Sequence, residues 1–302
     1  MAKLIIEAGR GERQYWRDLW RYRELFAFLA WRDLLIRYKQ TAVGVAWAVL
    51  RPFLTMLVLT LVMKVTKLEG DKVSPIPLFV FCAMLPWQFF STALSESGTS
   101  LITNSNLISK VYFPRLVVPA SSVITSFVDF LIAGAFMVFL MLVYWLMALY
   151  RFPPPGHLLA LPIFMLLTFG ASFGVGLWIA ALMVKYRDFR FVVPFIVQFG
   201  LYAAPVFAMT ANIPDRLPAT LPEKWHWLQW VSPALLDWVN PRLIYSLNPV
   251  VGIIDGFRWC LLGGPNALYW PGQAASLAGV AVLIFTGLWY FRKTERSFAD
   301  II

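Results

Sequence analysis

Carboxylates within apolar stretches are the first residues in this sequence that could do chemistry. Glu96 ends one long apolar run, and Asp129 lies well inside another. Glycosyl transfer or hydrolysis uses paired carboxylates, but these two belong to separate apolar runs. The two histidines, His157 and His226, have no clustered carboxylates around them, so a metal site or a histidine base is not indicated. The sequence therefore supports no enzymatic activity in this chain.

Asp129 allows two interpretations because an ionisable group deep in an apolar stretch is costly. Such a group by default indicates function, for example a proton relay or a substrate contact. The alternative is a carboxyl that is protonated or hydrogen-bonded between helices. We favour the alternative, since no second deep acid or base completes a relay.

Nucleotide chemistry needs a phosphate-binding loop, and the sequence lacks one. No Gly-x-x-x-x-Gly-Lys-Ser/Thr segment occurs, so the chain does not bind ATP by that route. We expect no cofactor and no metal in this chain.

The elements that carry these residues are predicted to be membrane spans. The chain is 60% hydrophobic and 14% charged, with a mean hydropathy of +0.68, which excludes a water-soluble globular domain. Six apolar stretches are long enough to cross a bilayer, at roughly 47–66, 76–95, 116–147, 158–184, 191–211 and 273–291. With the N-terminus inside, 18 of the 26 Lys and Arg residues fall on the cytoplasmic side and eight do not. This bias places both termini in the cytoplasm.

Cys82 and Cys260 form no metal-binding spacing. Both fall in the outer half of this topology, so a disulfide is one alternative. Two buried free thiols are the other, which we favour.

Residues 24–41 have the period of an amphipathic helix. Phe28, Trp31, Leu34, Leu35 and Tyr38 share one face, and Asp33, Arg37 and Gln40 lie on the other. No soluble domain is present to cover the apolar face, so we expect this helix to lie in the membrane interface.

A short apolar segment lies in the outer region at about 212–272. Asn248 and Pro249 predict a helix start, and Gly263 with Gly264 predicts its end. The 14 residues at 249–262 are too few to span a bilayer, so we expect a re-entrant helix. It should leave both Asn248 and Gly263 outside and narrow an outer gate formed by Asn248, Asp255, Arg258 and Trp259.

Two short polar segments, at 104–115 and 185–190, fall on the cytoplasmic side between apolar stretches. They are well placed to contact a cytosolic partner. Aromatic side chains can also pack on sugar rings, and candidate pore or packing residues are Trp87, Phe89, Phe90 and Asp129. The ordinary aromatic belt at membrane interfaces accounts for many of the other aromatics.

Several segments, in this order, resemble the permease subunit of ABC-2 type polysaccharide exporters. They are residues 31–41 (WRDLLIRYKQT), Gly44, Trp47, Pro52, 85–90 (LPWQFF), 106–115 (NLISKVYFPR), 185–188 (KYRD), 248–249 (NP), 256–258 (GFR) and 294–300 (TERSFAD). The resemblance covers nearly the whole chain.

The resemblance implies an all-α polytopic membrane protein with six transmembrane helices. It implies an N-terminal amphipathic interface helix and short re-entrant helices between spans 5 and 6. It divides the chain into a cytoplasmic segment at 1–46 and an ABC-2 type transmembrane domain at 47–302. Such permeases work as homodimers with two ATPase subunits, which carry ATP and Mg. The expected ATPase-coupling residues are Trp31, Arg32, Asp33, Arg37, Asn104, Asn106, Lys110, Arg115, Lys185, Arg187 and Asp188.

We therefore expect a channel-forming, multi-pass subunit in the bacterial inner membrane, exporting lipid-linked polysaccharide such as the O-antigen of lipopolysaccharide. Capsular polysaccharide, teichoic acid, and a small drug or lipid are alternative cargoes. A membrane-bound sugar or acyl transferase is the alternative from another class, but it would need facing catalytic acids or histidines.

Overall fold

The chain forms a bundle of helices. The computed structural model describes residues 12–39, 44, 46–67, 74–207, 210–213, 240–263, 268–295 and 298. Every regular element in these ranges is helical, as expected. The helices are α1 (Glu12–Arg21), α2 (Arg23–Lys39), α3 (Ala46–Thr66), α4 (Ile76–Thr103), α5 (Ser105–Lys110), α6 (Val117–Leu146), α7 (Pro155–Leu159), α8 (Leu161–Lys185), α9 (Phe189–Ala203), the 3₁₀ turn η1 (Thr210–Asn212), α11 (Pro241–Ser246), α12 (Pro249–Leu262) and α13 (Trp270–Glu295).

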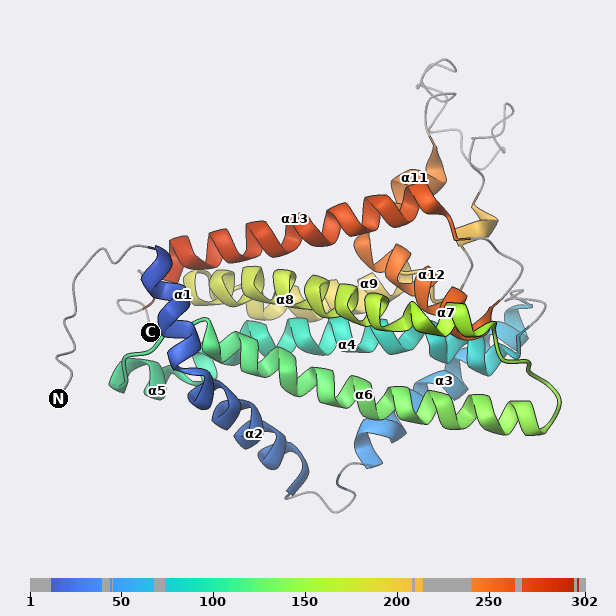
Figure 1. Cartoon of the computed structure of the whole chain (residues 1–302), viewed down its shortest axis with the longest axis horizontal. Coiled ribbons are helices and arrows are strands. Elements are labelled where there is room, and N and C mark those ends of the chain that lie inside the picture. Colours follow the sequence, from blue (N-terminus) through green and yellow to red (C-terminus); the bar gives the residue numbers. More distant parts are fainter. Residues whose placement is uncertain are drawn as a thin grey trace.

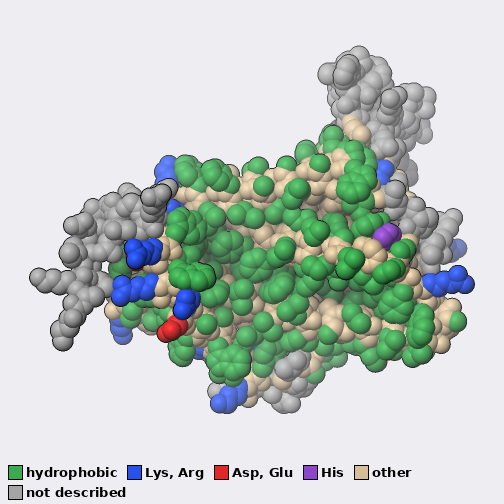
Figure 2. Space-filling view, viewed as in Figure 1, with side chains coloured by type: hydrophobic (Ala, Val, Ile, Leu, Met, Phe, Trp, Pro, Cys, Tyr) green, Lys and Arg blue, Asp and Glu red, His purple; other side chains and the backbone are tan. Residues whose placement is uncertain are grey.

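Long apolar helices run side by side through the bundle (Figure 1). Five stretches in the described residues are long and apolar enough to cross a membrane: α3, α4, α6, α7 with α8, and α13. The central helix is α4, which packs against α3, α6, α8, α9 and α12. Figure 2 shows hydrophobic side chains over most of one face, with Lys and Arg gathered mainly at the α1 end. The bundle is thus a multi-pass membrane domain.

The expected span at 191–211 is shorter than predicted. Helix α9 has 15 residues and ends at Ala203, so it is about 22 Å long, against a hydrocarbon core of roughly 30 Å. Ala204 is extended, with φ −88° and ψ 149°, because the residue before a proline disfavours the helical region and Pro205 follows. The proline shortens the helix.

Small residues let α8 and α13 approach closely. A Cβ added at Gly174 would lie 2.6 Å from the Leu283 carbonyl carbon, and one at Gly287 would lie 2.3 Å from the Gly174 oxygen. The two backbones are therefore in direct contact. Such contacts are a main source of helix association in lipid, where apolar burial gives little advantage.

Helix α2 forms as predicted, but its apolar face does not cover the bundle. Leu29 and Ala30 are buried, whereas Phe28 and Trp31 of the predicted apolar face are each more than 60% exposed. Most of the face that the sequence marks as apolar therefore points away from the other helices, but Tyr38 on its edge contacts Asp129 of α6. The opposite face carries Asp33 and Arg37 toward α4 and α6.

Helices α11 and α12 form a hairpin whose second arm has the predicted bounds. The Asn248 side chain accepts a hydrogen bond from the Val250 N–H at 3.2 Å, and Gly263 ends the helix in the left-handed region at φ +62°. In Figure 1, α11 enters the bundle and α12 returns toward the same end. Cys82 and Cys260 are both free and buried.

Candidate functional site

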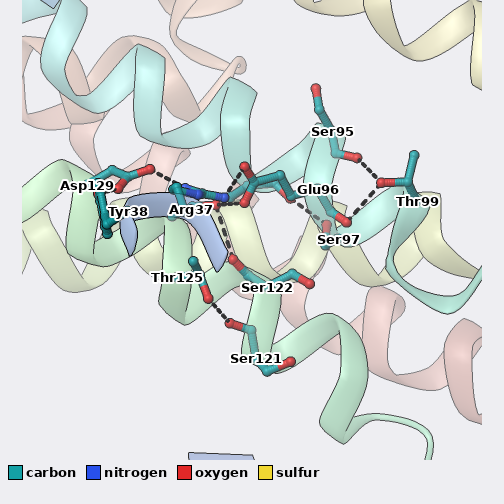
Figure 3. Close-up of polar contacts among 12 residues, drawn as sticks. Arg37, Tyr38, Ser95, Glu96, Ser97, Thr99, Ser121, Ser122, Thr125 and Asp129 are labelled. Carbon is teal, nitrogen blue, oxygen red and sulfur yellow. Dashed lines mark hydrogen bonds and ion pairs between the residues drawn. The ribbon is translucent and has the colours of Figure 1, made fainter. Parts of the chain in front are cut away.

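One arginine joins three helices at the α2 end of the bundle. The Arg37 guanidinium donates to the carboxylates of Glu96 on α4 and Asp129 on α6. Figure 3 shows it lying between the two carboxylates. The Tyr38 hydroxyl also donates to Asp129, and the Ser126 hydroxyl donates to Glu96 Oε2 at 2.8 Å. The carboxyl of Asp129 is thus hydrogen-bonded between helices, the interpretation we favoured.

The electrostatics of this cluster keep Arg37 charged. Burial pulls the pKa of the Arg37 guanidinium down, but the hydrogen bonds and charges of Glu96 and Asp129 outweigh it and raise the pKa above its ordinary value. Burial, followed by the hydrogen bond to Asp129, raises the pKa of the Tyr38 phenol, which stays a neutral donor. The arginine is therefore a permanent cation between two acids.

A second contact of α2 lies closer to its start. Arg32 Nη2 is 2.7 Å from Asp33 Oδ1 and 2.8 Å from Asn104 Oδ1, and the Asn104 amide nitrogen donates to the Ser100 carbonyl at 2.9 Å. Asn104 is the residue that follows the last turn of α4. Arg32 and Arg37 thus attach α2 to both the end and the interior of α4, so α2 cannot tilt without breaking charged contacts.

A cavity of about 820 Å³ opens beside Arg37, between α2, α3, α4 and α6. Its polar lining comes from Arg37, Tyr38, Trp47, Arg51, Thr55, Gln88, Thr92, Glu96, Ser126 and Asp129. Its apolar lining includes Leu54, Leu85, Phe89, Phe130 and Ala133. The volume lies within the range of small-ligand sites, about 300–1,000 Å³.

The other expected coupling residues fall into two groups. Trp31, Asn106, Lys110, Lys185, Arg187 and Asp188 are exposed at the surface. Arg115 is instead engaged inside the protein: its backbone N–H donates to Glu295 Oε1 at 2.9 Å, its guanidinium donates to the Glu295 carbonyl, and it lies 5.9 Å from the Phe298 ring centroid. Arg115 therefore holds the start of α6 against the end of α13.

The expected outer-gate residues do not share one surface. Arg258 is buried, donates to the Val206 carbonyl at 2.9 Å and lies 3.8 Å from the Phe79 ring centroid. The Trp259 ring stacks on His157 with centroids 4.0 Å apart. Asp255, three residues before Arg258, is half-buried on the same helix.

The two ends of α12 lie against different elements, and Asn248 lies part of the way along α13. A Cβ added at Gly279 would lie 3.5 Å from Pro249, and Gly279 is nine residues into α13, or about 14 Å from Trp270. Gly263 is beside Pro153, in the connection between α6 and α7. The sequence showed where α12 starts and stops but not which end enters the bundle, because α11 was not predicted.

The candidate pore or packing residues also fall into two groups, those that line the cavity and those that pack elsewhere. Phe89 lines the cavity, as does Asp129. The Trp87 ring packs against Gly200 of α9, and Phe90 is 5.8 Å from Trp87 between ring centroids. Sequence reasoning missed Gln88, Thr92 and Ser126, although the four-residue spacing of positions 88, 92 and 96 was a usable signal.

Comparisons with known proteins assign this arrangement to a class. Residues 24–236 match the family model described as ABC-2 type transporter. The chain is 29% identical over 207 residues to an O-antigen export system permease protein of Myxococcus xanthus, which covers 68% of this chain and 76% of the relative. A protein of the same name from Klebsiella pneumoniae is 24% identical over 285 residues, covering 92% of this chain and 95% of the relative.

Proposed function

The chain belongs to the ABC-2 type transporter family, and we propose that it is the membrane subunit of an ABC exporter that carries lipid-linked O-antigen polysaccharide out of the cytoplasm. The observation that carries this proposal is the similarity over 92% of the chain to a relative named as an O-antigen export permease. An inner-membrane location follows from the same proposal.

Six crossings with both termini in the cytoplasm form part of the proposal. Arg292 near the end of α13 lies 4.4 Å from the Tyr15 ring centroid in α1, so both ends of the described chain are on one side of the bundle. An even number of crossings then requires a sixth passage besides the five long stretches. After α9 the chain continues through residues 204–207, where the Val206 carbonyl accepts a hydrogen bond from Arg258, and α9 together with this segment is the candidate for that passage.

A homodimer would cover surfaces that one chain leaves open. On α9 only Val193 is buried, while Phe191, Phe195, Phe199 and Tyr202 are more than half exposed. Helix α9 is too short to match the thickness of the bilayer by itself. A second copy of the chain packed against these exposed aromatic residues would therefore stabilise α9 better than lipid does. The exposed aromatic stripe supports a dimer in which α9 lies near the twofold axis.

Coupling to a separate ATPase would act through α2. Arg32 and Arg37 connect α2 to α4 and α6, so a push on α2 reaches the cavity directly. The exposed cations Lys110 and Arg187 lie on neighbouring polar segments and offer further contacts. In this proposal ATP and Mg bind only to the partner, two copies of which serve the dimer.

Deletion of the gene tests the function. Cells that lack this chain should keep synthesising the lipid-linked polymer but lose long O-antigen from the outer surface, measured by gel profiles of lipopolysaccharide and surface immunolabelling. A plasmid copy should restore it. Unchanged surface polymer in the deletion strain would show that the chain exports something else.

Charge reversal of the surface cations tests the partner contact. Lys110→Glu or Arg187→Glu should lower recovery of the ATPase with the tagged permease by about tenfold, the effect of losing roughly 1.4 kcal/mol at an interface. Lys110→Arg and Arg187→Lys are the matched controls and should bind normally. Equal recovery in all four variants would remove these two segments from the interface.

A further inference from the structure

Two rows of polar side chains line the cavity beside Arg37. On α4, Gln88, Thr92 and Glu96 are spaced by four residues and line it together. On α3, Trp47, Arg51 and Thr55 have the same spacing and line it too. Residues four apart share a helix face, so each row extends over eight residues, or about 12 Å. Apolar residues needed for packing alone would not give this pattern on both helices.

Several groups in these rows are available to a ligand. Within the described parts of the chain, the side chains of Gln88, Thr92, Trp47 and Arg51 make no hydrogen bond or ion pair. Gln88 and Thr92 are nonetheless half-buried. A half-buried amide or hydroxyl that bonds no protein group keeps its donor and acceptor capacity, so these groups are suited to hydrogen-bond something that enters the cavity.

The chemistry of the lining selects a carbohydrate over a hydrocarbon chain or a small anion. An acyl chain would leave the amide, hydroxyl and carboxylate groups unpaired. A simple anion would meet the acids Glu96 and Asp129 as well as the cations Arg37 and Arg51, which leaves no net positive charge. A sugar offers hydroxyls that both donate and accept, together with apolar ring faces. The planar groups of Gln88, Arg51 and Glu96 match the hydroxyls, and Trp47 and Phe89 match the ring faces.

We propose that this cavity is a saccharide subsite of the transport path, in which Gln88 and Thr92 bind sugar hydroxyls and Trp47 packs on a sugar ring. The inference rests on the proposed export function and adds the residues that hold the polymer. The subsite shares Glu96 with the Arg37 bridge, so a sugar that hydrogen-bonds Glu96 competes with Arg37. Occupancy of the cavity and attachment of α2 thereby become linked.

Site-specific photo-cross-linking in cells tests the occupant. A diazirine amino acid at Thr92 should form an adduct that anti-O-antigen antibody detects in cells exporting polymer, and none in a strain blocked in polymer synthesis. The matched control position is Thr99, an exposed residue of the same helix that does not line the cavity. Its hydroxyl bonds only to backbone carbonyls of α4 itself. An adduct at position 92 that consists of phospholipid or a second copy of the chain would overturn the saccharide subsite.

Conservative variants give a second measurement that does not depend on the probe. Gln88→Leu and Thr92→Val should each slow polymer export by roughly 2- to 10-fold, the worth of one hydrogen bond, with normal membrane levels and normal ATPase recovery. Thr99→Val should export at the wild-type rate. If export requires the chain but neither variant slows it, only the subsite is wrong; if the deletion strain still exports polymer, the proposed function itself is wrong.

Discussion

Replacing Gly174 with leucine should prevent most of the protein from reaching its folded state. The new Cβ alone would lie 2.6 Å from the Leu283 carbonyl carbon and 2.7 Å from its oxygen, so α8 and α13 would have to separate. Because the obstacle is backbone and not a flexible side chain, we expect a destabilisation of about 3 kcal/mol, at the upper end for overpacking. The measurement is the yield of monodisperse protein in detergent and its thermal unfolding midpoint.

Gly134→Leu is the matched control for this substitution. Gly134 lies within α6, and a Cβ there meets nothing within 4 Å. It should give normal yield and a midpoint close to that of the wild type. Similar losses in both variants would mean that glycine is required for helix flexibility in general and not for the contact between α8 and α13.

Replacing Arg37 with methionine should release α2 and abolish export. The carboxylates of Glu96 and Asp129 would then lack their shared cation. These two side chains are only about a quarter to a third exposed. Breaking a fully buried pair costs about 3–5 kcal/mol, and solvent access reduces this to about 2 kcal/mol here. We expect a lower unfolding midpoint and loss of surface polymer. Lys39→Met, at an exposed position of the same helix, should change neither.

A compensating variant separates the charge from other roles of Arg37. Adding Glu96→Gln and Asp129→Asn to Arg37→Met removes both unpaired acids, so the unfolding midpoint should recover. Export should remain impaired, because no charged contact then joins α2 to the interior of α4 or to α6. A midpoint that stays low in the triple variant would mean that the Arg37 side chain stabilises the bundle mainly by packing.

The features that could be predicted from the sequence are those set by residues close together in the chain. Helix α12 was predicted with its bounds because Asn248, Pro249 and Gly263 act on their own neighbours. Pro205 carries an equally local signal for the end of α9, which the predicted span at 191–211 did not take into account.

The ionic centre could not be predicted in the same way because it is long-range. Arg37 is 59 residues from Glu96 and 92 from Asp129. Asp129 lies inside an apolar stretch, whereas the cation that pairs with it enters from the amphipathic helix. In the sequence, Arg37 belongs to the polar face of α2, which appeared suited to solvent or a partner. Only the packing of α2 on α6 shows that this face is turned inward.

The hairpin also sets an order in which the protein can be assembled. With 14 residues, α12 is too short to be inserted as a span by its own hydrophobicity. Its neighbours are α4, α7, α8, α11 and α13, and α13 leaves the ribosome after α12. Until Trp270–Glu295 has been synthesised and inserted, one of the helices that α12 packs against is missing. Arg258, which is buried in the folded protein, is then not fully enclosed. The hairpin therefore cannot be completed before α13 is in place, and a nascent chain that stops before α13 would expose an arginine-bearing apolar helix to quality-control proteases.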